Sequence, residues 1–263
     1  MGSLAFIGLG LYGERGISIE GLEGAKACDH VLLEGYTNTL PGLNLDSLKT
    51  LLSKEVTVVN RKYVEDGREL LSMADSGSVA LLVAGDPFIA TTHVDLRIRA
   101  AKRGIQVKVH HAPSIVSVAA GEAGLQNYKF GRSATITFPP PISDVPYDTL
   151  KQNRALDLHT LFFLDLRAEE ERFMTVGEGI ASLQRTEERR REGVMGQHTM
   201  VIGVARAGGP AQLIRGGRAG DVGGMDFGPP PHALIVPGRL HFMEAEALML
   251  FSAVPKELVE KNL

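Results

Sequence analysis

Short apolar runs alternate with segments of helical periodicity along the first half of the chain, and this alternation constrains the fold more than any other feature. The runs are apolar enough to be buried on both faces, as strands of parallel sheets are. The expected strands are Leu4–Ile7, His30–Glu34, Glu55–Val59, Val79–Val83 and Gln106–Val109. The expected helices are Ser18–Ala27, Asp46–Leu52, Val64–Ala74 and His93–Lys102. This order predicts an α/β domain with a largely parallel sheet.

The segment His110–Pro113 interrupts this rhythm, so the sequence predicts two α/β domains, residues 1–112 and residues 113–263. Ser114 is expected to cap a helix that runs to about Ala120. The expected strands of the second half are Ala134–Phe138, Thr160–Leu166, Met200–Ala205, Gln212–Arg215 and Ala233–Val236. The expected helices are Tyr147–Ala155, Thr175–Arg191 and Phe242–Ser252. Three prolines in a row at 139–141 and again at 229–231 predict loops.

Composition excludes several classes of protein. The chain has 263 residues, of which 44% are hydrophobic and 22% charged, as is usual for an ordinary globular protein. No apolar run is long enough for a membrane helix, and the first residues carry no signal for export. Cys28 is the only cysteine, which suits a reducing compartment such as the cytoplasm. The net charge of −3 argues against nucleic acid as a partner.

The one basic cluster, Arg185 with Arg189–Arg191, alternates with acidic residues at positions 187, 188 and 192. At helical spacing this pattern predicts a solvated face held by ion pairs.

A glycine motif near the start of the chain suggests two alternatives. Residues 8–13 match the dinucleotide-binding pattern G-x-G-x-x-G, they follow an expected strand, and Glu34 stands where the acidic partner of the ribose belongs. A dinucleotide, however, needs a helix that begins within the glycines. The best candidate for a helix cap is Ser18, which comes well after them. A tight turn is therefore favoured, and NAD binding remains the minor alternative.

Small and polar residues follow several of the expected strands. Gly85-Asp86-Pro87 comes after the fourth strand, and His111–Ile115 comes after the fifth. In the second half, Ala205–Gly208 and Pro231-His232 stand in similar positions. Small residues let a ligand approach the main chain, whose N–H and C=O groups can bind an adenosine without charged side chains. These strand ends are the expected ligand site.

Six short motifs occur in order along the chain. They are G-L-G-L at Gly8–Leu11, G-D-P-x-x-A-T-T-H at Gly85–His93, H-A-P-S-I at His111–Ile115, Y-K-F-G at Tyr128–Gly131, L-x-F-L-D at Leu161–Asp165 and P-P-H-x-L-I-V-P-G at Pro230–Gly238. Together they resemble the diphthine synthase family of tetrapyrrole-methylase-like enzymes. Each motif is weak alone, but six in the right order span nearly the whole chain. The resemblance implies two α/β domains with the active site in the cleft between them, and a homodimer.

The resemblance also implies a function. It implies transfer of methyl groups from S-adenosylmethionine, with S-adenosylhomocysteine as product, to the amine of an aminocarboxypropyl-modified histidine in translation elongation factor 2, giving diphthine in diphthamide biosynthesis. The cofactor-binding residues that it implies are Leu11, Asp86, Ile89, Ser114, Ile115, Leu164, Ala207 and His232. No catalytic base is assigned, because solvent can take the proton of an amine whose pKa is about 8.

Other interpretations of the same residues carry less weight. His93, His110, His111 and His198 lack the spacing of metal ligands, so ordinary hydrogen-bonded histidines and no metal site are expected. Ser114 lacks the G-x-S-x-G surroundings of a hydrolase nucleophile. Apolar residues at helical spacing between Phe242 and Ser252 predict a stripe that faces the core or a second subunit. A tetrapyrrole (precorrin-type) methyltransferase and a non-catalytic nucleotide-binding module remain as alternative functions.

Overall fold

The computed structural model describes residues 2–36 and 39–263, which form two compact units. The first unit comprises Met1–Ile115 with Ala168–Glu170, and the second comprises Val116–Arg167 with Glu171–Leu263. Each unit contains a five-stranded sheet of its own, packed against helices. Within the described residues, no helix has both the length and the apolar character needed to cross a bilayer.

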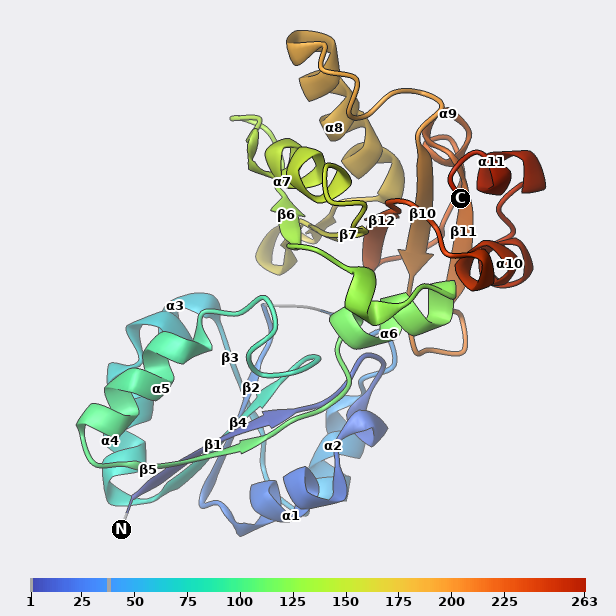
Figure 1. Cartoon of the computed structure of the whole chain (residues 1–263). Helices are drawn as coiled ribbons and strands as arrows, with labels where there is room; N and C mark the ends of the chain where they lie inside the picture. The colour runs from blue at the N-terminus through green and yellow to red at the C-terminus, as the bar shows by residue number, and fades with distance from the viewer. Residues whose placement is uncertain (1, 37–38) are drawn as a thin grey trace. The chain divides into compact units, whose positions relative to one another are not determined.

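The sheet of the first unit is entirely parallel (Figure 1). Its strands are β1 (Ser3–Gly8), β2 (His30–Glu34), β3 (Thr57–Val59), β4 (Ser78–Val83) and β5 (Gln106–His110). They lie in the order β3-β2-β4-β1-β5, so β1 is flanked by β4 and β5. The parallel α/β architecture predicted from the apolar runs is confirmed.

Helices cover both faces of this sheet (Figure 1). They are α1 (Ile19–Ala27), α2 (Leu45–Leu52), α3 (Arg61–Asp66), α4 (Arg68–Ser76) and α5 (His93–Lys102), and the 3-10 turn η1 (Glu14–Gly16) precedes α1. Alternate residues of β1 enter opposite cores, because successive side chains of a strand point to opposite faces. Ala5 and Ile7 pack with α1 and α2, whereas Leu4 and Phe6 pack with α3, α4 and α5.

The single helix expected over Val64–Ala74 is wrong, because Gly67 divides it into α3 and α4. Gly67 has a φ of +63°, a left-handed conformation that ends a helix. A Cβ at this position would lie 2.7 Å from Nη2 of Arg99, so the packing of α5 also favours glycine there.

The sheet of the second unit is mixed. Its strands are β6 (Ala134–Ile136), β7 (Thr160–Leu164), β10 (Met200–Ala205), β11 (Leu213–Arg218) and β12 (His232–Val236), in the order β11-β10-β12-β7-β6. Only β6 and β7 pair in parallel, and the other neighbours are antiparallel. Two short strands, β8 (Leu166–Arg167) and β9 (Arg172–Phe173), form a separate ribbon that the sequence did not indicate. The expected strand Thr160–Leu166 therefore ends early, at Leu164.

The remaining helices are α6 (Ile115–Ala123), α7 (Val145–Arg154), α8 (Val176–Arg190), α9 (Ala219–Val222), α10 (Phe242–Phe251) and α11 (Lys256–Glu260), with 3-10 turns η2 (Asn127–Lys129) and η3 (Ala168–Glu170). Tyr147 of α7 and Ile180 of α8 pack on Phe162 and Leu234, which lie in the middle of the second sheet. Thr175 and Glu178 form a capping box that begins α8.

The basic end of α8 differs from a purely solvated face. Arg190 does form ion pairs with Asp148 and Glu192, at 2.6 and 3.0 Å. Glu187, however, accepts a hydrogen bond from the hydroxyl of Tyr147 at 2.8 Å and from the N–H groups of residues 193–195. Burial opposes the charge of Glu187, but these donors outweigh it and lower the pKa to about 2. Glu187 therefore fixes the chain that follows α8.

Candidate functional site

Five of the eight predicted cofactor residues follow three adjacent strands of the first sheet. Leu11 follows β1, Asp86 and Ile89 follow β4, and Ser114 and Ile115 follow β5. Because β1 lies between β4 and β5 and all three run parallel, their carboxyl ends lie at one edge of the sheet. Open α/β sheets bind their ligands at this edge. The structure thus brings these five residues together.

The glycines after β1 and β4 allow two main chains to approach each other. The N–H of Gly85 donates to the carbonyl of Gly10 at 2.7 Å, and both glycines have a φ of +72°. A Cβ on Gly8 would lie 2.6 Å from the carbonyl oxygen of Gly85. Helix α1 begins only at Ile19, with Ser18 as its cap. The expected late start of this helix is confirmed, and the glycines do not form the helix-opening turn that a pyrophosphate requires.

Asp86 organises the loop after β4 and joins it to the loop after β5. The residue is buried, and its Oδ1 accepts a hydrogen bond from the N–H of Phe88 at 3.0 Å. Its Oδ2 lies 2.7 Å from Nδ1 of His111. The carbonyl of Asp86 accepts from the N–H of Ile89 at 3.2 Å. His111 is hydrogen-bonded, as the sequence predicted, but its partner lies 25 positions earlier, and this pairing depends on the strand order.

The other three predicted residues lie at neighbouring strand ends, on one side of the second sheet. Leu164 ends β7, His232 begins β12, and Ala207 follows β10. In the antiparallel register, Ala205 lies opposite His232, and Phe163 lies opposite Ala233. The end of β7, the start of β12 and the end of β10 are therefore neighbours. Leu164 and Ala207 are buried, with exposed fractions of 7% and 6%.

Arg206 holds the loops on either side of these strand ends, a role that the sequence did not indicate. Its side chain is buried, its Nε donates to the carbonyl of Ala211 at 2.8 Å, and its Nη1 donates to the carbonyls of Phe227, at 2.7 Å, and of Pro229. Its φ of +50° is unusual for a residue with a side chain. Strained conformations of this kind concentrate at functional sites. Arg206 thereby fixes the turn that carries Ala207.

His232 presents a hydrogen-bond acceptor that no other described residue satisfies. Its Nε2 lies 3.2 Å from the carbonyl of Pro229, and since a carbonyl only accepts, Nε2 must carry the proton. Burial lowers the pKa of His232, which favours the neutral imidazole at pH 7. Its buried Nδ1 then offers a lone pair and has no partner among the described residues. A ligand that brings a donor to these strand ends would satisfy it.

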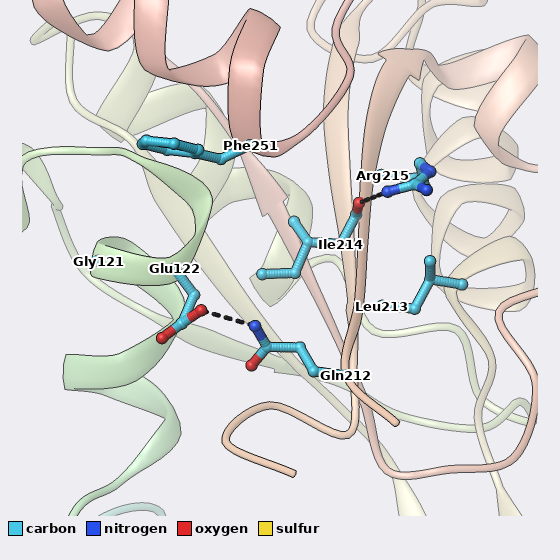
Figure 2. A pocket seen from close by; sticks show the side chains of 7 residues that line it. All are labelled: Gly121, Glu122, Gln212, Leu213, Ile214, Arg215 and Phe251. Atoms are coloured by element: carbon cyan, nitrogen blue, oxygen red, sulfur yellow. Dashed lines mark hydrogen bonds between the residues drawn. The ribbon is translucent and has the colours of Figure 1, made fainter. Parts of the chain in front are cut away.

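Two cavities lie away from these residues, one within each unit. Figure 2 shows the cavity of the second unit, about 470 Å³ in volume, where α6, β11 and α10 supply the lining. There Nε2 of Gln212 donates to Glu122 at 2.6 Å, and Oε1 of Gln212 accepts from the N–H of Gly208 at 2.7 Å. The cavity of the first unit, about 430 Å³, lies beside α1 and β5. None of the eight predicted residues lines either cavity.

Comparison with known proteins gives consistent results for sequence and structure. The family described as tetrapyrrole (corrin/porphyrin) methylases matches residues 3–223. The diphthine synthase of Methanosarcina mazei is 45% identical over 98% of both chains, and that of Methanocella arvoryzae is 46% identical over 93% of this chain and 96% of its own.

Solved structures agree. A crystal structure of diphthine synthase superimposes with a TM-score of 0.90 at 35% identity, covering 99% of both chains. That of a putative diphthine synthase from Entamoeba histolytica gives a TM-score of 0.89 at 36% identity, covering 97% of this chain and 100% of that one. Since the similarity extends over both sheets and nearly every residue, the chain belongs to the diphthine synthase family of tetrapyrrole methylases.

Proposed function

We propose that this chain methylates the amine of an aminocarboxypropyl-modified histidine in translation elongation factor 2, giving diphthine in the biosynthesis of diphthamide. Full-length similarity to diphthine synthases is the observation that carries the proposal. Membership in this family makes the chain an S-adenosylmethionine-dependent methyltransferase. The protein substrate is taken from the activity of the relatives.

We assign cofactor binding to Leu11, Asp86, Ile89, Ser114 and Ile115 of the first unit and to Leu164, Ala207 and His232 of the second. Three observations support this assignment. Glycines stand at several of the strand ends that carry these residues, among them Gly8, Gly10 and Gly85, and such small residues let a ligand approach the main chain. Gly85 faces open space, because a Cβ built on it meets no atom within 4 Å. The unpartnered Nδ1 of His232 fits the donor of an adenine amino group.

The residues of the site fit a reaction that needs alignment more than acid–base chemistry. S-adenosylmethionine supplies a methyl group on a positively charged sulfur, which is already a good leaving group. The lone pair of the acceptor amine forms the new N–C bond while the C–S bond breaks, and the amine proton passes to solvent. Holding the two reactants in line can supply about 7–11 kcal/mol. The hydrogen bonds that fix the loops around Asp86 and Arg206 serve this positioning.

We also propose that the chain functions as a homodimer in the cytoplasm. Phe242, Met243, Leu250 and Phe251 of α10 are each more than half exposed, which is an unusual apolar surface for an isolated chain. Strand β11 is the outermost strand of the second sheet, and Phe251 lines a cavity together with it. A second copy would cover these side chains. The cytoplasmic location follows from a substrate that takes part in translation, and the single, buried Cys28 suits it.

The test is incubation with labelled S-adenosylmethionine and an elongation factor that carries the unmethylated aminocarboxypropyl histidine, followed by mass spectrometry. The expected result is added methyl mass on that histidine. Cofactor binding without added mass would contradict the proposed substrate. A parallel reaction with a precorrin-type tetrapyrrole tests the alternative that the family description raises.

A further inference from the structure

Two buried ionisable residues, Glu34 and His93, form hydrogen bonds that tie down the loop after β4. His93, the first residue of α5, is 1% exposed, and its Nδ1 lies 2.8 Å from the carbonyl oxygen of Pro87. Its Nε2 lies 2.9 Å from Oε2 of Glu34, the last residue of β2, whose side chain is completely buried. The hydroxyl of Thr91 donates to the same carbonyl at 2.7 Å. The loop that carries Asp86 is therefore tied to β2 through His93.

The two partners of His93 fix how many protons the pair holds. A carbonyl oxygen only accepts hydrogen bonds, so Nδ1 must carry a proton. The contact between Nε2 and Oε2 then needs a second proton, because a bare imidazole nitrogen and a carboxylate both offer lone pairs and would repel each other. Whichever atom bears that proton, the intact geometry requires it. Burial opposes a charged imidazole, but the hydrogen bond and charge of Glu34 outweigh this and raise the pKa of His93.

A second buried pair in the same chain is arranged in the opposite way. In the second unit, Nε2 of His159 lies 2.9 Å from Oε1 of Glu244, but its Nδ1 accepts a hydrogen bond from the N–H of Gly238 at 3.0 Å. His159 therefore needs only one proton to satisfy both contacts. Burial lowers the pKa of His159, in agreement with a neutral ring. His159 can therefore be compared with His93 in the same sample: the contacts of His159 require one ring proton, whereas those of the pair of His93 and Glu34 require two.

Loss of the second proton would disturb the loop. Oε1 of Glu34 makes no hydrogen bond of standard geometry among the described residues, so His93, together with the nearby hydroxyl of Tyr36, compensates this buried carboxylate. An uncompensated buried carboxylate is strongly unfavourable. The ring of Phe6 lies 6.0 Å from the His93 ring and 5.4 Å from the ring of Phe88, so aromatic side chains pack on this side of the pair.

Few other ionisable groups act on the pair. Burial, the charge of Glu34 and a hydrogen bond to its carboxylate raise the pKa of Tyr36, so this phenol stays neutral near pH 7 and keeps its proton. Arg61 lies over the ring of Tyr36, and Arg97 lies over the ring of Phe88. Asp86 is engaged by His111 on the other side of the loop. Glu34 is the group within hydrogen-bond distance that can share the proton with His93.

We infer that Glu34 and His93 are positioning residues for the cofactor, and that they hold the Gly85-Asp86-Pro87 loop in its binding conformation through one shared proton. The inference about cofactor binding rests on the proposed function. The protonation of the pair does not, because it follows from the contacts of His93 alone.

The first experiment measures protonation by ¹⁵N NMR of imidazole-labelled protein without ligand. The expected result near pH 7 is that both ring nitrogens of His93 are protonated, whereas His159 is protonated at Nε2 only. A His93 ring with an unprotonated Nε2 and an ionised Glu34 would overturn the inference, whatever the protein binds.

The second experiment measures the Kd of S-adenosylhomocysteine from about pH 7 to about pH 9.5 in three proteins. In Glu34→Gln the side-chain amide can donate a hydrogen bond to Nε2 of a neutral His93. The variant therefore keeps the contacts from Pro87 through His93 to residue 34 without the extra proton that the wild type needs. The ratio of the wild-type Kd to that of Glu34→Gln is expected to rise by about tenfold or more with pH. The amine of the ligand also titrates over this pH range, but it changes the Kd of both proteins by the same factor, so its effect cancels in the ratio. Asp95→Asn, on the exposed side of α5, should follow the wild type at every pH.

Two further variants separate positioning from folding. Glu34→Ala and His93→Ala should raise the Kd about tenfold or more near pH 7, and Glu34→Gln should recover most of this loss. Melting temperatures without ligand at each pH identify any variant that fails to fold. If an alanine variant fails to fold, the comparison of the wild type with Glu34→Gln decides the outcome. Parallel pH profiles for the wild type and Glu34→Gln would contradict the inference. A wild type that binds no S-adenosylhomocysteine at any pH would instead contradict the proposed function.

Discussion

Oδ2 of Asp86 lies 2.7 Å from Nδ1 of His111, and this contact joins the loop after β4 to the loop after β5. The carboxylate is largely buried, whereas the His111 side chain is mostly exposed. With the N–H of Phe88 on Oδ1, both oxygens of Asp86 are engaged within the protein. Asp86 therefore shapes the main chain around the site, in the same loop that His93 holds through Pro87.

Asp86→Ala is expected to weaken binding of S-adenosylhomocysteine by about ten- to a hundredfold, since a hydrogen bond to a charged group contributes about 1.5–3 kcal/mol. Calorimetric titration measures the change. Asp95→Ala is the control, because that side chain is 70% exposed and only pairs with Arg99 on the surface of α5. If Asp86→Ala bound the ligand normally but transferred no methyl groups, Asp86 would belong to the catalytic machinery instead.

S-adenosylmethionine and S-adenosylhomocysteine are expected to raise the melting temperature, and NAD is not. A ligand that binds only the folded state adds about 2.7 kcal/mol at a hundredfold excess over its Kd. NAD should fail because α1 begins at Ile19, away from the glycines that would have to hold a pyrophosphate. Thermal unfolding with each ligand checks this, and stabilisation by NAD alone would refute the assignment of the cofactor.

Acid is expected to destabilise the second unit through Glu244. Burial opposes the charge of Glu244, but hydrogen bonds from the N–H groups of His241 and Gln126 and from Lys129 and His159 lower its pKa to about 2. The pKa in the unfolded chain is about 4.3, so this stabilisation is complete above that pH and is lost as the pH falls toward 2. The loss is on the order of 3 kcal/mol.

Urea unfolding at a series of pH values between about 6 and 2 measures this loss. Glu244→Gln should lower stability near neutral pH, because Lys129 loses its buried counterion at 2.7 Å, and should flatten the dependence on acid. Glu260→Gln is the matched control, since Glu260 is 58% exposed and its pair with Lys256 spans 3.6 Å. An equally steep acid dependence in Glu244→Gln would assign the effect to other carboxylates.

A charge on the exposed face of α10 is expected to impair self-association. Leu250 is 69% exposed, and Leu250→Asp would place a carboxylate where a second copy has to exclude water. Leu156 is equally exposed but follows α7, so Leu156→Asp controls for the loss of a surface leucine. Sedimentation analysis should give a dimer for the wild type and for Leu156→Asp and a monomer for Leu250→Asp. An unchanged dimer in Leu250→Asp would place the interface elsewhere.

Local patterns in the sequence determined the parallel sheet of the first unit and the start of α1. Apolar runs such as Leu4–Ile7 are buried on both faces of a parallel sheet, and the hydroxyl oxygen of Ser18 caps α1 by accepting a hydrogen bond from the N–H of Gly21. Both signals act within a few residues of chain. The same locality explains the error over Val64–Ala74, where an amphipathic pattern continues across Gly67 but the main chain turns left-handed against α5.

Only the tertiary structure decided which polar residues meet. The pairs Glu34 with His93 and Asp86 with His111 are separated by 59 and 25 positions, and they form because the strand order β3-β2-β4-β1-β5 brings those strand ends to one edge of the sheet. Strand order depends on how distant segments pack, and no periodicity in the sequence encodes it. For the same reason, the sequence could single out Asp86 by its motif, whereas the protonation and role of His93 follow only from the atoms that surround it.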